Sequence, residues 1–194
     1  MARIATIDPQ SATGKAKTLL DAVQSKMKMV PNLMRVLASS PAALEGYLNF
    51  NESLSHGLLS GQLRELISVV VADANGCQYC LSAHTAIGKM MGLKEGDILS
   101  SRKLNSGDPK IDTALRFARD LVQRRGQVDE AEVEVLRTAG YSDGEIAEII
   151  TNVGLNIFTN YFNNAVQTEI DFPKVDLKKA AQQTQKGAFK NPGG

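Results

Sequence analysis

The sequence is short of the residues that many metal-bound, disulfide-stapled or nucleic-acid-binding proteins depend on. Its 194 residues include two cysteines, two histidines and no tryptophan. With 43% apolar residues, the chain is expected to bury an ordinary core as a single domain, without metal or disulfide staples. The 22 basic and 21 acidic side chains lack the excess of positive charge typical of a general nucleic-acid-coating protein.

The charge is also unevenly spread. Residues 1–40 carry six basic and two acidic side chains, and residues 174–194 carry five and one, so the segment between them is net acidic. We therefore expect the folded core to repel polyanions and to bind no nucleic acid.

Long apolar runs are missing too. The longest, Leu66 to Ala72, is interrupted by Ser68 and falls far short of the roughly 18 to 20 residues that span a bilayer. The start, MARIATIDPQ, has no apolar stretch before Asp8 and so does not read as a secretory signal. We expect a cytoplasmic protein without membrane contact, in a compartment where structural disulfides are rare.

Alternating strand patterns are nearly absent, which predicts an all-α fold. Helix starts are indicated at Ser40–Pro41, Ser60, Asp108–Pro109, Asp129 with Glu132, and Ser142 with Glu145. Helix ends are indicated at Pro31, at Asn75–Gly76 and at Gly126. We expect one helical domain over residues 1–177, followed by a flexible C-terminal tail over residues 178–194, where the apolar content is lost.

The chain contains a weak internal echo. Shifting Glu65, Cys77, Cys80 and His84 by 83 residues gives Glu148, Asn160, Asn163 and Gln167, and the neighbouring apolar residues also align. The echo suggests two related helix hairpins, although apolar spacing repeats by chance in helical proteins. The run Asn156, Asn160, Asn163 and Asn164 is unusual for a helix and suggests a polar interface or pocket.

Both cysteines, Cys77 and Cys80, lie three residues apart, and His84 follows four residues later. On a helix these three side chains share one face, so the His84 ring can touch the Cys80 sulfur. The helix start also places both sulfurs near unpaired N–H groups, which stabilise a thiolate. We interpret the pattern as a reactive thiol pair.

Glu65 joins this group through geometry. If the chain reverses at Asn75–Gly76, a residue ten before the turn faces one about ten after it, close to His84. A carboxylate there would orient the imidazole, giving a relay of Glu65, His84 and Cys80.

Other interpretations of the same residues remain open. The cysteines could be inert and buried, or they could bind zinc with His84 and a fourth ligand, for which His56 is the candidate. A thioredoxin-type site would need a strand before the motif, which this sequence does not offer.

The stretch LSGQLRELISVVVADANGCQYCLSAHTAIGKMMGL, residues 59–93, resembles the alkylhydroperoxidase D and carboxymuconolactone decarboxylase-like proteins, particularly their peroxidase-related subgroup. The family pattern is a Glu, a C-x-x-C that begins twelve residues later, and a His four residues after the second Cys. It falls on Glu65, Cys77, Cys80 and His84, and the flanking helices extend the resemblance over residues 15–173.

The resemblance implies an all-helical fold, a homo-oligomer (dimer, trimer or hexamer) and reduction of hydroperoxides, with no metal or flavin cofactor. It also implies that Cys80 forms the sulfenic acid and Cys77 resolves it, whereas the helix dipole alone favours Cys77 as the more acidic thiol. Well-studied members carry a His just before the second Cys, where this chain has Tyr79, so its relay is expected to be shorter or weaker.

The main functional expectation is a thiol-dependent peroxidase whose disulfide is reduced by an external dithiol, such as a lipoyl or thioredoxin-like protein. Three alternatives stay open. The dithiol could be a redox sensor or stress protein with little turnover, or the chain could be a carboxymuconolactone decarboxylase-type enzyme, although such members lack the cysteine pair. The third is a helix-turn-helix regulator around residues 139–150, which the acidic charge there disfavours.

Overall fold

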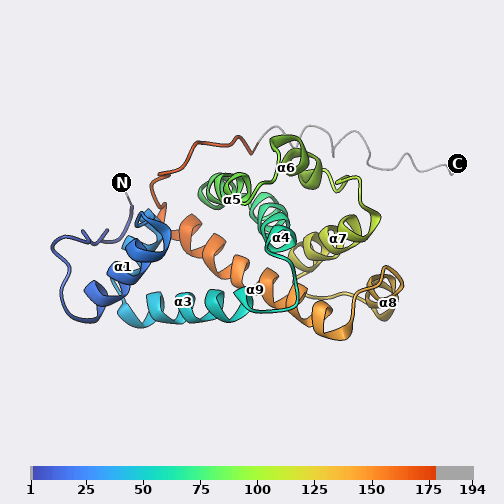
Figure 1. Cartoon of the computed structure of the whole chain (residues 1–194), viewed down its shortest axis with the longest axis horizontal. Helices are drawn as coiled ribbons and strands as arrows, with labels where there is room; N and C mark the ends of the chain where they lie inside the picture. The colour runs from blue at the N-terminus through green and yellow to red at the C-terminus, as the bar shows by residue number, and fades with distance from the viewer. Residues whose placement is uncertain (1, 178–194) are drawn as a thin grey trace, which may run out of the picture.

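The computed structural model describes residues 2–177. Within that range it is all helical, as the sequence predicts, with the helices and connections shown in Figure 1. The helices are α1 (Gly14–Met27), α2 (Asn32–Leu37), α3 (Pro41–Ser55), α4 (Gly61–Ala74), α5 (Gln78–Met90), α6 (Glu95–Arg102), α7 (Pro109–Gln123), α8 (Glu130–Thr138) and α9 (Asp143–Val166). The predicted C-terminal tail, residues 178–194, lies outside the described residues.

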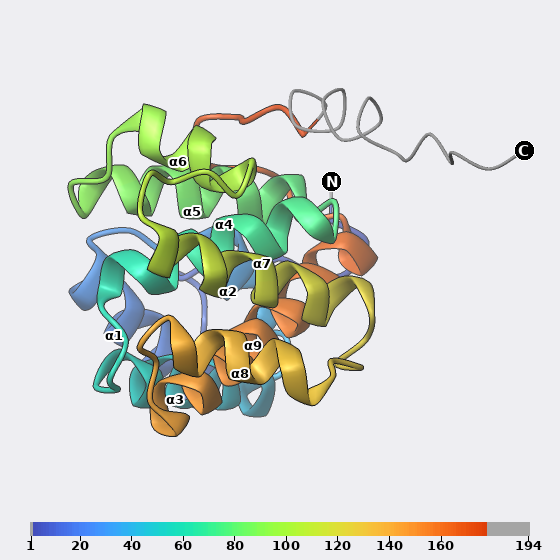
Figure 2. The ribbon, with the colours of Figure 1, turned by 90° about the vertical axis from the view of Figure 1, so that its right-hand side faces the viewer.

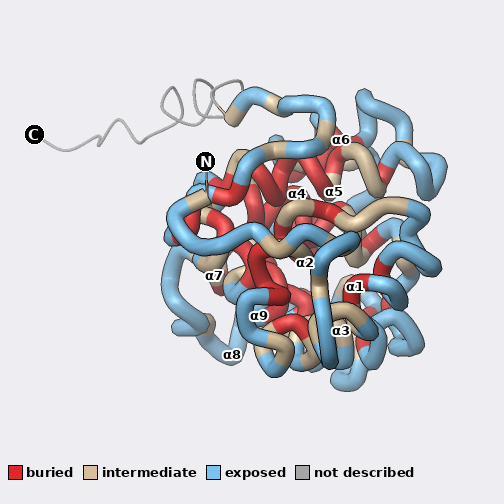
Figure 3. The backbone as a smooth tube through the Cα atoms, turned by 90° about the vertical axis from the view of Figure 1, so that its left-hand side faces the viewer, coloured by how far each residue is buried: buried red, intermediate tan, exposed pale blue. Residues whose placement is uncertain are grey.

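Helix α4 lies at the centre and separates two hydrophobic clusters. One cluster joins α4 to α7, α8 and α9 and includes Ile67, Leu115 and Ile149, each fully buried. The other joins α4 to α1, α2, α3 and α5 and includes Leu20, Leu44 and the two cysteines. The buried residues, red in Figure 3, are correspondingly concentrated in α4, α5 and α9. A hydrophobic surface on both sides explains why α4 has the longest apolar run of the sequence.

Local capping signals place most helix starts where the sequence predicts them. The Ser40 and Ser60 hydroxyls accept N–H groups of the first turns of α3 and α4, and Asp108 does the same for α7. Reciprocal capping boxes begin α8 at Asp129 and α9 at Ser142. Among these described residues, none of the helices has the length and apolarity needed to cross a membrane.

Helix α6 is the element that the sequence analysis does not predict. It is short, it begins after Lys94 instead of a typical capping residue, and only Ile98 among its large apolar side chains is buried. A single buried apolar position gives no hydrophobic periodicity to detect. In Figure 2 this helix lies at one end of the molecule, beyond α5 and α4, with α3 at the opposite end.

The second helix hairpin suggested by the internal echo does not form, because residues 143–166 make one continuous helix, α9. In the first copy the chain reverses at Gly76, whose φ of 62° lies in the left-handed region. The corresponding residue after a shift of 83 is Thr159, a β-branched residue for which that conformation is strained. Without a glycine the helix continues.

Candidate active site

The two cysteines lie where the chain turns from α4 into α5. Cys77 is the N-cap of α5, and its sulfur accepts the Cys80 N–H at 3.2 Å. The two residues form a disulfide with their Cα atoms 5.3 Å apart, and their exposures are 0% and 3%. The helical spacing thus brings the two sulfurs into bonding distance, as a dithiol–disulfide couple requires.

Glu65 and His84 meet across the same hairpin, as the position of the turn predicts. Glu65 comes from α4 and His84 from α5, and Glu65 Oε2 lies 2.9 Å from His84 Nδ1. Because a carboxylate can only accept here, the imidazole donates from Nδ1 and keeps Nε2 as its basic nitrogen. Their side chains are 16% and 20% exposed, so this pair lies nearer to solvent than the sulfurs do.

The side chain that hydrogen-bonds the Cys80 sulfur is not His84. Within residues 2–177 that hydrogen bond comes from Asn163 of α9, whose Nδ2 lies 3.3 Å from Cys80 Sγ. Asn163 is 3% exposed, and its Oδ1 is buried without a hydrogen-bond partner. Sequence reasoning selected the asparagine run but could not place it, because α9 follows α5 by more than fifty residues.

The asparagines of α9 face the α4–α5 hairpin along its length. Asn156 Nδ2 donates to Ser68 Oγ of α4 at 3.0 Å. Asn160 Oδ1 accepts from Asn75 in the turn at 3.0 Å, and Asn164 Nδ2 donates to the Asn75 carbonyl at 3.1 Å. The run is therefore a polar interface inside the molecule, which fixes the turn that carries the cysteines.

Tyr79, which stands just before the second cysteine, has a structural contact. Its hydroxyl accepts the Leu33 N–H at 3.0 Å, at the start of α2, and its ring packs edge-on against Phe172. Burial raises the pKa of Tyr79, so the phenol stays neutral at physiological pH. The Tyr79 hydroxyl is thus used to hold α2 in place.

Tyr47 of α3 is a neighbour of the relay that sequence reasoning missed. Burial, and then the charge of Glu65, raise the pKa of Tyr47 to about 12. Its ring lies 6.4 Å from that of Phe158 on α9. No spacing rule links α3 to Glu65, so only the tertiary structure identifies this aromatic side of the site.

The zinc alternative loses its fourth ligand in the structure. His56 caps the C-terminus of α3 and lies 3.2 Å from Glu52 on the same helix, with its side chain 75% exposed. The described residues contain no group of three or more His, Cys, Asp or Glu side chains arranged to hold a metal.

The structure gives the helix-turn-helix alternative no support. Helix α9 directs Ile146, Ile149 and Val153 into the core, and its first turn is acidic. A recognition helix would need its outward face, with basic side chains, free to enter a DNA groove.

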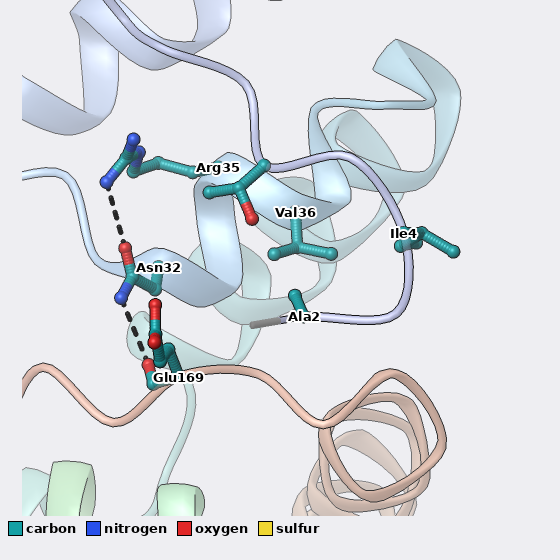
Figure 4. Close-up of a pocket in the computed structure, with 7 residues that line it drawn as sticks. Ala2, Ile4, Asn32, Arg35, Val36 and Glu169 are labelled. Atoms are coloured by element: carbon teal, nitrogen blue, oxygen red, sulfur yellow. Dashed lines mark hydrogen bonds between the residues drawn. The ribbon is translucent and has the colours of Figure 1, made fainter.

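A cavity of about 380 Å³ lies away from the cysteines, between the N-terminal segment, α2 and the segment after α9. Figure 4 shows two hydrogen bonds among the lining residues: the Arg35 side chain donates to Asn32 Oδ1, and Asn32 Nδ2 donates to the backbone carbonyl of Glu169, each at 3.0 Å. This cavity has none of the thiol, imidazole or relay groups described above.

Comparison with known proteins agrees with this geometry. Residues 41–120, which include the hairpin, match the model of the carboxymuconolactone decarboxylase family. The structure is similar to an alkylhydroperoxidase AhpD core, a peroxidase-related protein from Ralstonia eutropha JMP134, with a TM-score of 0.79 and 24% identity over 88% of this chain and 92% of that one. A peroxidase-related protein from Silicibacter sp. TM1040 gives a TM-score of 0.78 and 25% identity, over 87% and 91% of the two chains.

The same fold occurs in a more distant protein. The debrominase Bmp8, in a complex with 2,3,4-tribromopyrrole, gives a TM-score of 0.75 at 15% identity, covering 94% of this chain and 99% of that one. At that identity the likeness concerns the fold alone. No curated protein sequence gives a significant match.

Proposed function

We propose that this chain, whose residues 41–120 match the carboxymuconolactone decarboxylase family model and whose fold is similar to that of peroxidase-related AhpD proteins, is a thiol-dependent peroxidase that reduces hydroperoxides with its cysteine pair. The observation that carries the proposal is the cysteine pair itself, bonded as a disulfide at the start of α5, with the Glu65–His84 pair on the same hairpin. Decarboxylation of a lactone has no use for a dithiol that closes in this way.

The chemistry begins with the reduced pair. His84 Nε2, oriented by Glu65, accepts the Cys80 proton, and the thiolate attacks the O–O bond of the peroxide. One oxygen stays on sulfur as the sulfenic acid, and the other leaves as an alcohol or water after taking the proton from His84. Direct contact between the ring and Cys80 is expected in the reduced state, in which the sulfur carries a proton to transfer.

Cys77 completes the cycle. Its thiol condenses with the Cys80 sulfenic acid, which releases water and forms the disulfide found here. Two electrons must then return from an external dithiol, such as a lipoyl or thioredoxin-like protein, because the chain has no third cysteine. Cys80 is the attacking residue in this scheme, as the resemblance implies and as its place one helical turn before His84 favours.

The test is a thiol titration of the reduced protein before and after one equivalent of cumene hydroperoxide or hydrogen peroxide. We expect two thiols per chain to fall to none, and added dithiothreitol to sustain many turnovers. Cys80→Ser should reduce peroxide consumption to background. Its matched control, Cys77→Ser, should still consume one equivalent and stop at a sulfenic acid that a dimedone-type reagent traps.

Two results would overturn the proposal. Consumption of peroxide by Cys80→Ser at the parent rate would exclude this thiol as the reacting group. Oxidation that stops after one equivalent of peroxide, although dithiothreitol is present in excess, would instead indicate a redox sensor with little turnover.

A further inference from the structure

Asn163 lies closer to the chemistry than its place in the sequence suggests. It belongs to α9, yet its amide nitrogen lies 3.3 Å from Cys80 Sγ, in a site where both residues are 3% exposed. We infer that Asn163 is a catalytic residue of the peroxidase, which stabilises the Cys80 thiolate through its amide N–H. This inference rests on the proposed function and adds to it a group from outside the cysteine motif.

Burial explains why this contact matters. A thiolate that is removed from water loses solvation, so burial alone would raise the pKa of the Cys80 thiol and leave it unreactive. An N–H donor at hydrogen-bond distance favours the charged form and opposes that loss. The His–Glu pair can remove the proton, but it is Asn163 that contacts the sulfur on which the negative charge remains.

The two sulfurs receive donors of different kinds. Cys77 Sγ accepts the backbone N–H of Cys80, as any helix N-cap would. Cys80 Sγ accepts a side-chain amide that is held among further asparagine contacts to the α4–α5 turn. The side-chain donor is therefore specific to Cys80, the cysteine that the proposed mechanism uses for attack.

The other half of the same amide also favours the reduced pair. Asn163 Oδ1 is buried and accepts no hydrogen bond while the cysteines form a disulfide. A disulfide has no proton to offer, whereas reduction adds protons to the sulfurs and attack on peroxide adds a hydroxyl to Cys80. Asn163 thus interacts better with the reduced and sulfenic forms than with the disulfide, which makes the disulfide easier to reduce.

The experiment measures the pKa of the Cys80 thiol directly, in full-length protein carrying Cys77→Ser so that one thiol remains. Thiolate absorbance and the rate of iodoacetamide alkylation are followed against pH, with no peroxide present. Asn163→Leu, which keeps the side-chain shape but removes the donor, should raise that pKa by about one to two units. Asn163→Ala should act in the same direction.

Asn156→Leu is the matched control. Asn156 is also 3% exposed on α9, and it hydrogen-bonds Ser68 instead of a sulfur. It should lower stability to a similar extent and leave the thiol pKa unchanged. If Asn163→Leu and Asn163→Ala fold, by circular dichroism, but keep the parent pKa, the inference is wrong. It is equally wrong if Asn156→Leu shifts the pKa as far.

A second readout uses the two-cysteine protein. In a dithiothreitol redox titration, the disulfide of Asn163→Leu should be harder to reduce than that of the parent, so its reduction potential should be more negative. A shift of about 30 mV corresponds to a tenfold change in the equilibrium constant for reduction by dithiothreitol. An unchanged potential would contradict the preference for the reduced pair. These measurements do not depend on peroxide turnover, so a shifted pKa in a protein that consumes no peroxide would refute the proposed function while still showing that Asn163 stabilises the Cys80 thiolate.

Discussion

The α4–α5 hairpin and helix α9 present similar residue spacings with different results. In the hairpin, Glu65 is followed twelve and fifteen residues later by Cys77 and Cys80. In α9, Glu148 is followed at the same two spacings by Asn160 and Asn163. In the hairpin the chain reverses at Gly76, and Glu65 reaches His84 at 2.9 Å. In the uninterrupted α9, twelve residues extend about 18 Å, so Glu148 cannot fold back onto its own asparagines.

Glu148 has a different partner as a result. Its carboxylate accepts the N–H groups of Leu58 and Leu59 at 2.8 and 3.1 Å, in the loop between α3 and α4. A Cβ on Gly57 would lie 2.5 Å from that carboxylate, so the loop approaches it closely because this residue is glycine. The turn at Gly76, more than the residue spacing, makes one glutamate part of a relay and leaves the other as a loop anchor.

The sharpest test of this contrast replaces each glutamate with glutamine. Glu65→Gln should slow peroxide reduction by about 10² or more, because a neutral amide orients the His84 ring and stabilises its cation poorly. Glu148→Gln should leave the rate within about twofold and lower the free energy of unfolding by about 1 kcal/mol. Stopped-flow peroxide kinetics and urea denaturation measure the two effects. Equal losses of rate in both variants would contradict the assignment of separate roles.

A second comparison concerns packing. Ile67 of α4 is fully buried, whereas Ile150, its counterpart after the 83-residue shift, is 44% exposed. Ile67→Ala should cost about 2–5 kcal/mol of unfolding free energy, and Ile150→Ala less than about 0.5 kcal/mol. Urea denaturation at several protein concentrations measures both. If Ile150→Ala instead lowered the unfolding free energy about as much as Ile67→Ala, and by an amount that depends on protein concentration, another chain would cover Ile150 in solution.

The smallest expected effect concerns the first turns of α9 and α4, which are capped differently. Helix α9 starts with Ser142 and Glu145, and hydrogen bonds from the Ser142 backbone and side chain lower the pKa of Glu145. α4 starts with Ser60 alone and has Leu63 at the matching position. A lowered folded-state pKa stabilises the protein above the ordinary value of 4.5, and this contribution is lost as the pH falls through the folded-state pKa.

Glu145→Gln should therefore be less stable than the parent at pH 7, by less than about 1 kcal/mol, and the difference should disappear in acid. Thermal denaturation between pH 7 and pH 3 provides the measurement, with Gln62→Glu in the first turn of α4 as a control that adds a carboxylate where the parent has none. A difference that persists unchanged to pH 3 would mean that the Glu145 charge contributes nothing.

The features that could be predicted from sequence are local ones. Ser40, Ser60 and Ser142 cap helices within three residues of themselves, and the Glu65–His84 contact follows from one hairpin with an identifiable turn. Contacts between distant elements could not be predicted. Asn163 meets Cys80, and Tyr47 lies near Glu65, only because α9 and α3 pack against the hairpin, and no sequence spacing encodes that packing.

Tyr79 links the redox centre to a distant part of the chain. It stands between the two cysteines in the first turn of α5, and its hydroxyl holds the first turn of α2 through Leu33. A movement of that turn when the disulfide opens would have to break this hydrogen bond or carry the start of α2 with it. The start of α2 is thereby joined by a hydrogen bond to the residue that stands between the two sulfurs.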